Sequence, residues 1–199
     1  MAELRKEAFG PRGDSARHRG AAELAAGFLA LAEAPKEAGR LVLIVRRLAN
    51  GTREAPGSVL LSPEEGVPGD GWGRRPPRNP EAQLAVMNHP VAALIANGQP
   101  LTVFGDNLFV DLDISAENLP MGARLRVGEA VVEVTPKPHN GCSKFRERFG
   151  QAALDFVGAA ATRNRNLRGI YWKVVEAGTV RVSARIEVLS RPDRGLEIG

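Results

Sequence analysis

Short runs rich in Val, Ile and Leu, most of them bounded by Gly-containing turns, recur through the chain. Arg40–Ala49 is such a run, and it ends at Asn50–Gly51, a pair typical of a tight turn between strands. A second strand-like stretch follows over 52–61. Apolar and polar residues alternate over 125–134, which predicts a hairpin, and a last pair of strands is expected around Ala177–Gly178. This pattern restricts the chain to a fold built mainly from short strands.

The middle of the chain adds further short elements. The stretch 81–98 is interpreted as a strand up to Met87 followed by a short helix, because Pro90 suits a first helical turn and Asn88 can cap it. Two short strands are predicted within 100–115, around Gly105–Asn107. No strand–helix–strand rhythm appears, so a doubly wound parallel sheet is disfavoured and a closed or nearly closed β-barrel fits best.

Helices are few and lie beside the strands in the sequence. Apolar residues at helical spacing predict one helix over Ala21–Ala32, and residues 143–158 are helical with Phe145, Phe149 and Phe156 near one face. The predicted fold class is therefore mainly β (α+β), a barrel with a few short peripheral helices and an N-terminal helix. The expected organisation is a helical extension over 1–39, a barrel domain over 40–190 and a tail over 191–199.

The composition excludes several function classes. A single cysteine among 199 residues forms no internal disulfide and, with three histidines, rules out a Cys-rich zinc site. The N-terminus has no apolar signal-peptide core, and no apolar run approaches the roughly 18 residues of a membrane span, so a cytoplasmic protein is expected. The net charge of +4 is compatible with a phosphate-bearing partner or with a solvated basic surface. Only 5% of residues are aromatic, which disfavours a stacking platform for nucleic acid.

The one cysteine lies in a polar loop, "TPKPHNGCSKFRERFG", rather than in an apolar run. A helix is expected to start at about Ser143, directly after Cys142, and basic residues surround the thiol on both sides. Positive charge and a helix start both favour the thiolate form, which can carry sulfur or bind a soft metal. A buried, inert structural cysteine is the alternative. His139 is either a proton shuttle or second-layer donor, or a loop histidine.

Two further stretches are candidates for anion binding. Arg163, Arg165 and Arg168 in "RNRNLRG" offer several forked donors that could hold a phosphate, against the alternative of a solvated loop. The stretch "GDGWGRR" offers Asp70, and Arg74 with Arg75, where glycines allow close backbone approach; a plain surface loop is again the alternative.

In order and spacing, these stretches resemble the MOSC domain, which forms the C-terminus of molybdenum cofactor sulfurases. "EEGVPGDGWGRR" is similar to its Gly-x-x-Gly-Asp loop. "FGDNLFVDLDISAENLPMGARLRVGEAVVEVTPKPHNGC" resembles its central segment up to the motif cysteine, and "LRGIYWKVVEAGTVRVSARIEVL" resembles its closing strands. The resemblance covers about residues 40–189 and implies a β-barrel-rich fold. Asp106 replaces the usual glutamate, and Gly71 with Trp72 replaces the commoner Arg-His pair.

The resemblance also implies a link to the molybdenum cofactor, a molybdopterin that carries a phosphate. Cys142 matches the motif cysteine, which in relatives carries sulfur as a persulfide or binds molybdenum in reductases of N-hydroxylated compounds. We therefore expect Cys142 and His139 to be catalytic and Cys142 to be the metal ligand. The residues expected to bind the cofactor are Asp70, Asn107, Lys144, Arg146, Arg163, Arg165 and Arg168.

The same resemblance sets expectations for partners. The chain has no pyridoxal-phosphate domain of the kind found in large sulfurases, so no pyridoxal-phosphate site is expected, and sulfur would come from a donor such as a cysteine desulfurase. A reductase would instead need an electron-donor protein. A homodimer is compatible with the sequence, whereas membrane and nucleic-acid partners are not expected. Two alternatives stay open: a non-catalytic module that binds or delivers a pterin or another anionic metabolite, and a basic barrel that binds nucleic acid.

Overall fold

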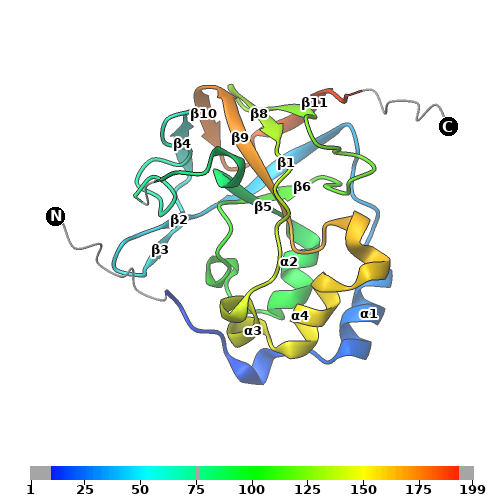
Figure 1. The fold of residues 1–199 in the computed structure, drawn as a ribbon. Coiled ribbons are helices and arrows are strands. Elements are labelled where there is room, and N and C mark those ends of the chain that lie inside the picture. The colour runs from blue at the N-terminus through cyan, green and yellow to red at the C-terminus, as the bar shows by residue number, and fades with distance from the viewer. Residues whose placement is uncertain (1–9, 75–76, 193–199) are drawn as a thin grey trace.

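The computed structural model describes residues 10–74 and 77–192, and its central feature is a closed β-barrel (Figure 1). Seven strands form the barrel in the order β1-β11-β7-β8-β9-β5-β6. Their bounds are β1 Ala38–Ile44, β5 Leu84–Asn88, β6 Leu108–Asp111, β7 Arg124–Val127, β8 Ala130–Val134, β9 Ile170–Glu176 and β11 Arg185–Ser190. The predicted fold class, a mainly β barrel with a few short helices, is confirmed.

Side chains from all seven strands fill the barrel interior. Trp172 is the largest of them and is fully buried, and Leu41, Val86 and Leu125 meet it in one apolar cluster. Alternate residues of β7 and β9 are buried, so the period-two pattern of the sequence marks the face that points inward. The hairpin of β7 and β8 forms as predicted, with Val127 opposite Ala130.

One strand–helix–strand unit with parallel strands occurs, although the sequence pattern predicted none. Strand β5 is followed by helix α2 (His89–Ala96), and β6 then pairs with β5 in parallel. The predicted change from strand to helix at this point is confirmed, and the Asn88 side chain caps the helix by accepting a hydrogen bond from the Val91 amide at 3.0 Å. The other barrel pairs are antiparallel, so the fold is not a doubly wound sheet.

Two small sheets flank the barrel and correct the predicted strands. The expected strand over 52–61 is two strands, β3 (Arg53–Glu54) and β4 (Ser58–Leu61), separated by a segment that contains Pro56. Strand β3 pairs with β2 (Arg46–Arg47). The last strand pair is also different, because β10 (Gly178–Arg181) leaves β9 and pairs with β4.

The helices gather on one side of the barrel, below it in Figure 1. They are α1 (Ala21–Leu29), α2, α3 (Ser143–Phe149) and α4 (Gln151–Gly158), and they share a second apolar cluster with Phe104 and Phe109. The single helix predicted over 143–158 is broken at Gly150, whose φ of 89° ends α3. Because of this break, Phe156 packs against Phe28 and does not share a face with Phe145 and Phe149, which pack against each other on α3.

Short 3₁₀ turns complete the described chain: η1 (Ser15–Arg17), η2 (Pro80–Ala82), η3 (Leu101–Val103) and η4 (Ala160–Arg165). The first of the two strands predicted around Gly105–Asn107 is wrong, because residues 101–103 form η3 and only β6 is a strand. Among the described residues, no helix is both long enough and apolar enough to span a bilayer.

Candidate functional site

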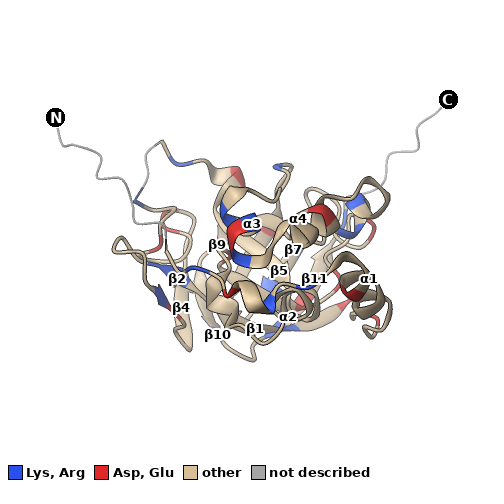
Figure 2. Ribbon diagram, turned by 90° about the horizontal axis from the view of Figure 1, so that it is seen from below, with Lys and Arg blue, Asp and Glu red and all other residues tan. Residues whose placement is uncertain are grey.

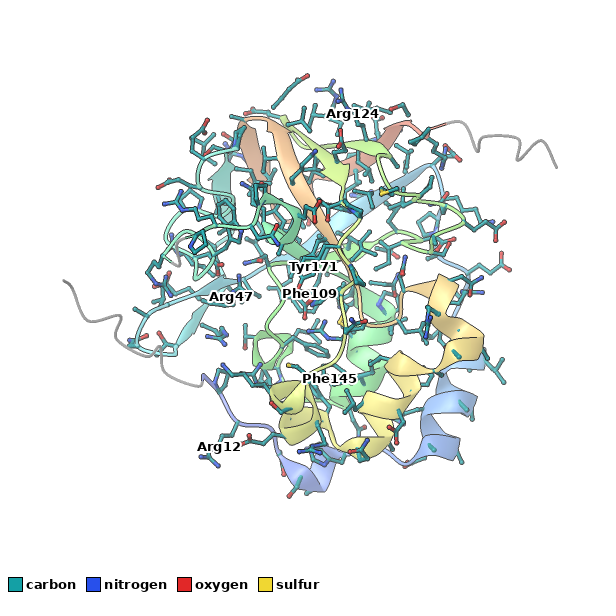
Figure 3. All side chains as sticks on the ribbon, in the orientation of Figure 1. Arg12, Arg47, Phe109, Arg124, Phe145 and Tyr171 are labelled. Atoms are coloured by element: carbon teal, nitrogen blue, oxygen red, sulfur yellow. The ribbon has the colours of Figure 1, made fainter. Side chains whose placement is uncertain are left out.

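A pocket of about 410 Å³ opens between the barrel and helix α3. In Figure 3, Arg47, Tyr171 and Phe145 lie in this region, whereas Arg124 lies at the far end of the barrel. Residues distant in sequence supply its polar lining: Arg47, Arg53, Asn79, His139, Cys142, Lys144, Arg148, Arg168 and Tyr171. Seen from the helical side, basic residues lie on β2 and along α3 (Figure 2). The pocket therefore combines one thiol with several cations.

Cys142 is the residue directly before α3, as predicted, and its thiol is free and exposed. Its backbone is extended, and its carbonyl accepts the hydrogen bond of the Arg146 amide at 3.0 Å, the first bond of the helix. Glycine is required at the preceding position, Gly141, because a Cβ there would overlap the Leu154 side chain of α4. The Asn-Gly-Cys turn thus brings the thiol to the pocket while lying close against a helix.

A buried group of three polar side chains lies at one wall of the pocket, where Arg168 and His139 form the lining and Asp106 lies behind them. Arg168 donates from Nη1 to both carboxylate oxygens of Asp106 at 2.9 Å, and Asp106 is fully buried. His139 Nδ1 lies 3.6 Å from Asp106 Oδ1, beyond hydrogen-bond distance, and has no hydrogen-bond partner among the described residues. The His139 ring lies against Tyr171, with the ring centroids 4.3 Å apart.

His139 is neutral at physiological pH. Burial, and then the positive charge of Arg168, lower the pKa of its imidazole from 6.5 to about 3, although Asp106 acts in the opposite direction. At pH 7 such an imidazole can form hydrogen bonds, but it neither supplies nor takes up a proton. Tyr171 is also neutral, because burial raises the pKa of its phenol.

Asp70 and Asn107 act on the site through Arg47. Asp70 is buried, accepts hydrogen bonds from the backbone amide of Arg47 at 2.7 Å and from its Nε at 2.9 Å, and forms an ion pair with its Nη2. Burial alone would lower the pKa of Arg47, but the hydrogen bonds and charge of Asp70 raise it. Asn107 accepts from the Ala85 amide at 3.1 Å and donates to the Val45 carbonyl at 3.3 Å. It also accepts a long hydrogen bond from Arg47 Nη2 at 3.4 Å, so it lies behind the pocket, where it joins the barrel strands to Arg47 rather than lining the pocket itself.

Of the other residues predicted to bind the cofactor, some line the pocket and others lie away from it. Lys144 and Arg168 line the pocket, whereas Arg146 is exposed on α3 and is not part of the lining. Arg163 and Arg165 are exposed on η4, and Arg165 lies over the Phe28 ring at 5.5 Å beside a different hollow. Arg74 donates to the carbonyls of Gly69 and Arg47 at 2.6 and 2.9 Å, and Arg75 lies outside the described residues.

Five polar lining residues were missed: Arg47, Arg53, Asn79, Arg148 and Tyr171. Arg47 interrupts an apolar strand-like run, and that interruption is the one local signal that could have marked it. The others become neighbours only when the barrel closes and α3 packs beneath it. Among the described residues, no group of three or more His, Cys, Asp or Glu side chains is arranged to hold a metal ion.

Comparisons with solved structures support the fold. A hypothetical protein of known structure matches with a TM-score of 0.53 and 23% identity, covering 79% of this chain and 69% of that one. The YuaD protein from Bacillus subtilis matches with a TM-score of 0.53 and 16% identity, covering 76% and 95%.

Sequence comparisons point to the same architecture. The uncharacterized protein YflK of Bacillus subtilis is 33% identical over 95 residues, which are 48% of this chain. The match spans 40% of that relative, less than half of its length. The family model of the MOSC domain matches residues 80–187, which include β5 to β9, α3 and Cys142. The chain therefore belongs to the MOSC domain family, a family associated with the molybdenum cofactor.

Proposed function

We propose that the pocket binds the molybdenum cofactor, with the Cys142 thiolate as a ligand of molybdenum, and that the protein reduces N-hydroxylated compounds. The observation that carries this proposal is the position of the exposed thiol in a pocket lined by Arg47, Arg148 and Arg168. A thiolate is a soft ligand, and forked guanidinium groups suit the phosphate of a pterin cofactor.

The donor set favours a metal that arrives with ligands of its own. The described residues offer no cluster of three or more ligating side chains, so they would hold a bare metal ion poorly. Cys142 is a single sulfur donor, which suits a metal already bound by a cofactor. Buried nitrogens of the pocket also lack hydrogen-bond partners among the described residues, namely Arg168 Nε and His139 Nδ1. Such atoms are typical of a site shaped for a polar ligand.

When bound, the cofactor supplies oxidation and reduction at its metal, and the residues of the chain orient the reactants. Lys144 and Arg148 hold positive charge beside Cys142 and favour anionic groups in the pocket. His139, neutral and close to Asp106, can form a hydrogen bond with a bound substrate. Asp70 fixes Arg47, so its proposed contribution to cofactor binding is indirect.

Sulfur carriage is the second candidate, and the exposure of Cys142 favours it. The thiolate would attack the outer sulfur of a donor persulfide, such as that of a cysteine desulfurase. A new sulfur–sulfur bond would form on Cys142, and the donor thiolate would leave. This reaction needs an accessible thiol but no bound metal.

Metal analysis by mass spectrometry tests the proposal on protein from a host that makes molybdenum cofactor. We expect near-stoichiometric molybdenum and reduction of an N-hydroxylated substrate by the wild type, and loss of both in Cys142→Ser. The control is Ser143→Ala, a change at the neighbouring exposed residue.

The other outcomes separate the alternatives. Equal molybdenum in wild type and Cys142→Ser, without turnover in either, would favour a binding or delivery module. Absence of molybdenum from both proteins would contradict the ligand role. A persulfide that forms on Cys142 would then support sulfur carriage.

A further inference from the structure

Two arginines face each other across the small sheet beside the pocket. In the pairing of β2 with β3, Arg47 lies directly opposite Arg53. Like charges at opposite positions of a strand pair are destabilising unless each is compensated. Arg47 is compensated by the buried carboxylate of Asp70. In this strand pair, therefore, the charge of Arg47 is balanced by a carboxylate, and the charge of Arg53 has to be accommodated in another way.

Arg53 has no such carboxylate. Its Nη1 donates to the carbonyls of Gly51 and Thr52 at 3.1 and 3.3 Å, and no described residue forms an ion pair with it. Its Nε is buried and has no hydrogen-bond partner among the described residues. The side chain lines the pocket and also a second, adjoining hollow. Arg53 therefore lines the pocket with a guanidinium group whose Nε has no acceptor among the described residues.

A second guanidinium converges on the same place. Arg148 of α3 is buried, and its Nε donates to the Pro11 carbonyl at 3.0 Å. A Cβ at Gly10 would lie 2.5 Å from Arg53 Nη2 and 3.3 Å from Arg148 Nη2. Gly10 has a φ of 90°, so the segment before η1 turns tightly over both groups. The guanidinium groups of Arg53 and Arg148 therefore both lie close to the Cα of Gly10.

Burial and the crowding of positive charge lower the pKa of the Arg53 guanidinium. Burial, followed by the charges of Arg148 and Arg47, lowers the pKa of Arg53 from 12.5 to about 10. The group stays protonated at pH 7, so its charge is retained at a position where neighbouring cations disfavour it. An anion bound here would relieve that repulsion and accept forked hydrogen bonds.

We propose that Arg53, Arg148 and the Gly10–Pro11 turn form an oxyanion subsite that binds the phosphate group of the pocket's ligand. The identity of that ligand rests on the proposed function, but the subsite does not require it. Gly10 and Arg53 lie outside the residues matched by the family model, 80–187. The subsite replaces Arg163 and Arg165, which lie on η4 away from the pocket lining, as the proposed phosphate contact.

Thermal unfolding in inorganic phosphate, against chloride at equal ionic strength, tests the subsite. We expect phosphate to raise the Tm of the wild type, and Arg53→Gln to weaken phosphate binding at least about tenfold. In chloride, Arg53→Gln should unfold at the wild-type Tm or above it, because a crowded cation is removed. The control Arg124→Gln, at the far end of the barrel, should keep the wild-type phosphate response (Figure 3).

Gly10→Ala provides a second test that keeps both arginines. The new Cβ would press on both guanidinium groups, so the phosphate response should weaken, whereas Gly57→Ala, with no atom within 4 Å of its new Cβ, should leave it unchanged. A wild type without a phosphate-specific rise in Tm would overturn the proposal. So would an unchanged phosphate response in Arg53→Gln, and an unchanged response in Gly10→Ala would remove the turn from the subsite.

Failure of this proposal and of the proposed function can be told apart. Cys142→Ser should keep the phosphate response even where it loses molybdenum. The molybdenum content of Arg53→Gln then identifies the source of the phosphate. Loss of molybdenum together with the phosphate response assigns the subsite to the cofactor's phosphate, and retained molybdenum assigns it to a phosphorylated substrate.

Discussion

Two groups of arginines in this protein differ in what surrounds them. Arg163 and Arg165 are close in sequence, and both are exposed on η4. Arg47, Arg148 and Arg168 come from separate parts of the chain and line one pocket together with Arg53. Arg168 belongs to the same basic run of the sequence as Arg163 and Arg165, but only the fold brings it together with Arg47, Arg53 and Arg148. A run of basic residues in the sequence is therefore a weaker indication of an anion-binding site than the burial and the ion-pair partners of each arginine in the fold.

The largest expected effect comes from breaking the buried pair of the pocket group. Arg168→Met leaves the fully buried Asp106 without its cation, so we expect the free energy of unfolding to fall by about 3–5 kcal/mol. Arg163→Met, in the exposed group, should change it by less than about 0.5 kcal/mol. Chemical denaturation followed by circular dichroism measures both values.

A double variant sharpens this test. Replacing both partners, as Asp106→Leu with Arg168→Met, removes the unpaired charge and should recover part of the lost stability. If Arg168→Met cost no more than Arg163→Met, the two groups would not differ in the way that their burial indicates.

An intermediate effect is expected from pH, through His139. The unfolded chain takes up the imidazole proton near the ordinary pKa of 6.5, whereas the folded protein takes it up only at about 3. Acidification through this window therefore favours unfolding, and between pH 7 and pH 5 the loss should be about 2 kcal/mol. Denaturant titrations at the two pH values should show this loss in the wild type and in Arg163→Gln. His139→Gln should lose most of the pH dependence; an unaltered slope in that variant would contradict the burial of a neutral imidazole.

The parts of the fold that were predicted are those with local signals. Asn88 and Pro90 mark a helix start within a few residues, and alternation over 125–134 marks a hairpin, so both were found. The 3₁₀ turn at Leu101–Val103 was missed, since its apolar residues equally suit a strand. The pairing of β4 with β10 joins residues far apart in sequence, and no local pattern encodes it.

The candidate site follows the same rule. Cys142 and the helix start after it were predicted because the loop sequence is polar and glycine-containing at that point. The partner of Asp106 could not be predicted, because Arg168 reaches it only after β9 has joined the barrel. Arg53 had no distinguishing neighbour in the sequence, and its significance depends on Arg47 opposite and Arg148 beneath.

The smallest expected effect concerns the exposed group itself. The Arg165 guanidinium lies 5.5 Å from the centroid of Phe28, whose ring packs edge-on against Phe156 at 5.8 Å. An exposed cation–π contact stabilises by about 0.5–1 kcal/mol, so Arg165→Gln should lower the Tm by about 1–4 °C. Differential scanning calorimetry can resolve this change, and Arg165→Lys should restore part of it.

The same variant decides whether the two arginine groups act separately. Arg165 contacts α1 and takes no part in lining the pocket, so Arg165→Gln should leave both the molybdenum content and the phosphate response at wild-type values. Loss of either would mean that η4 belongs to the site after all, and that a basic run in the sequence had marked it directly. Retention of both, beside the losses expected in Arg53→Gln, would place ligand binding with the arginines that the fold brings together.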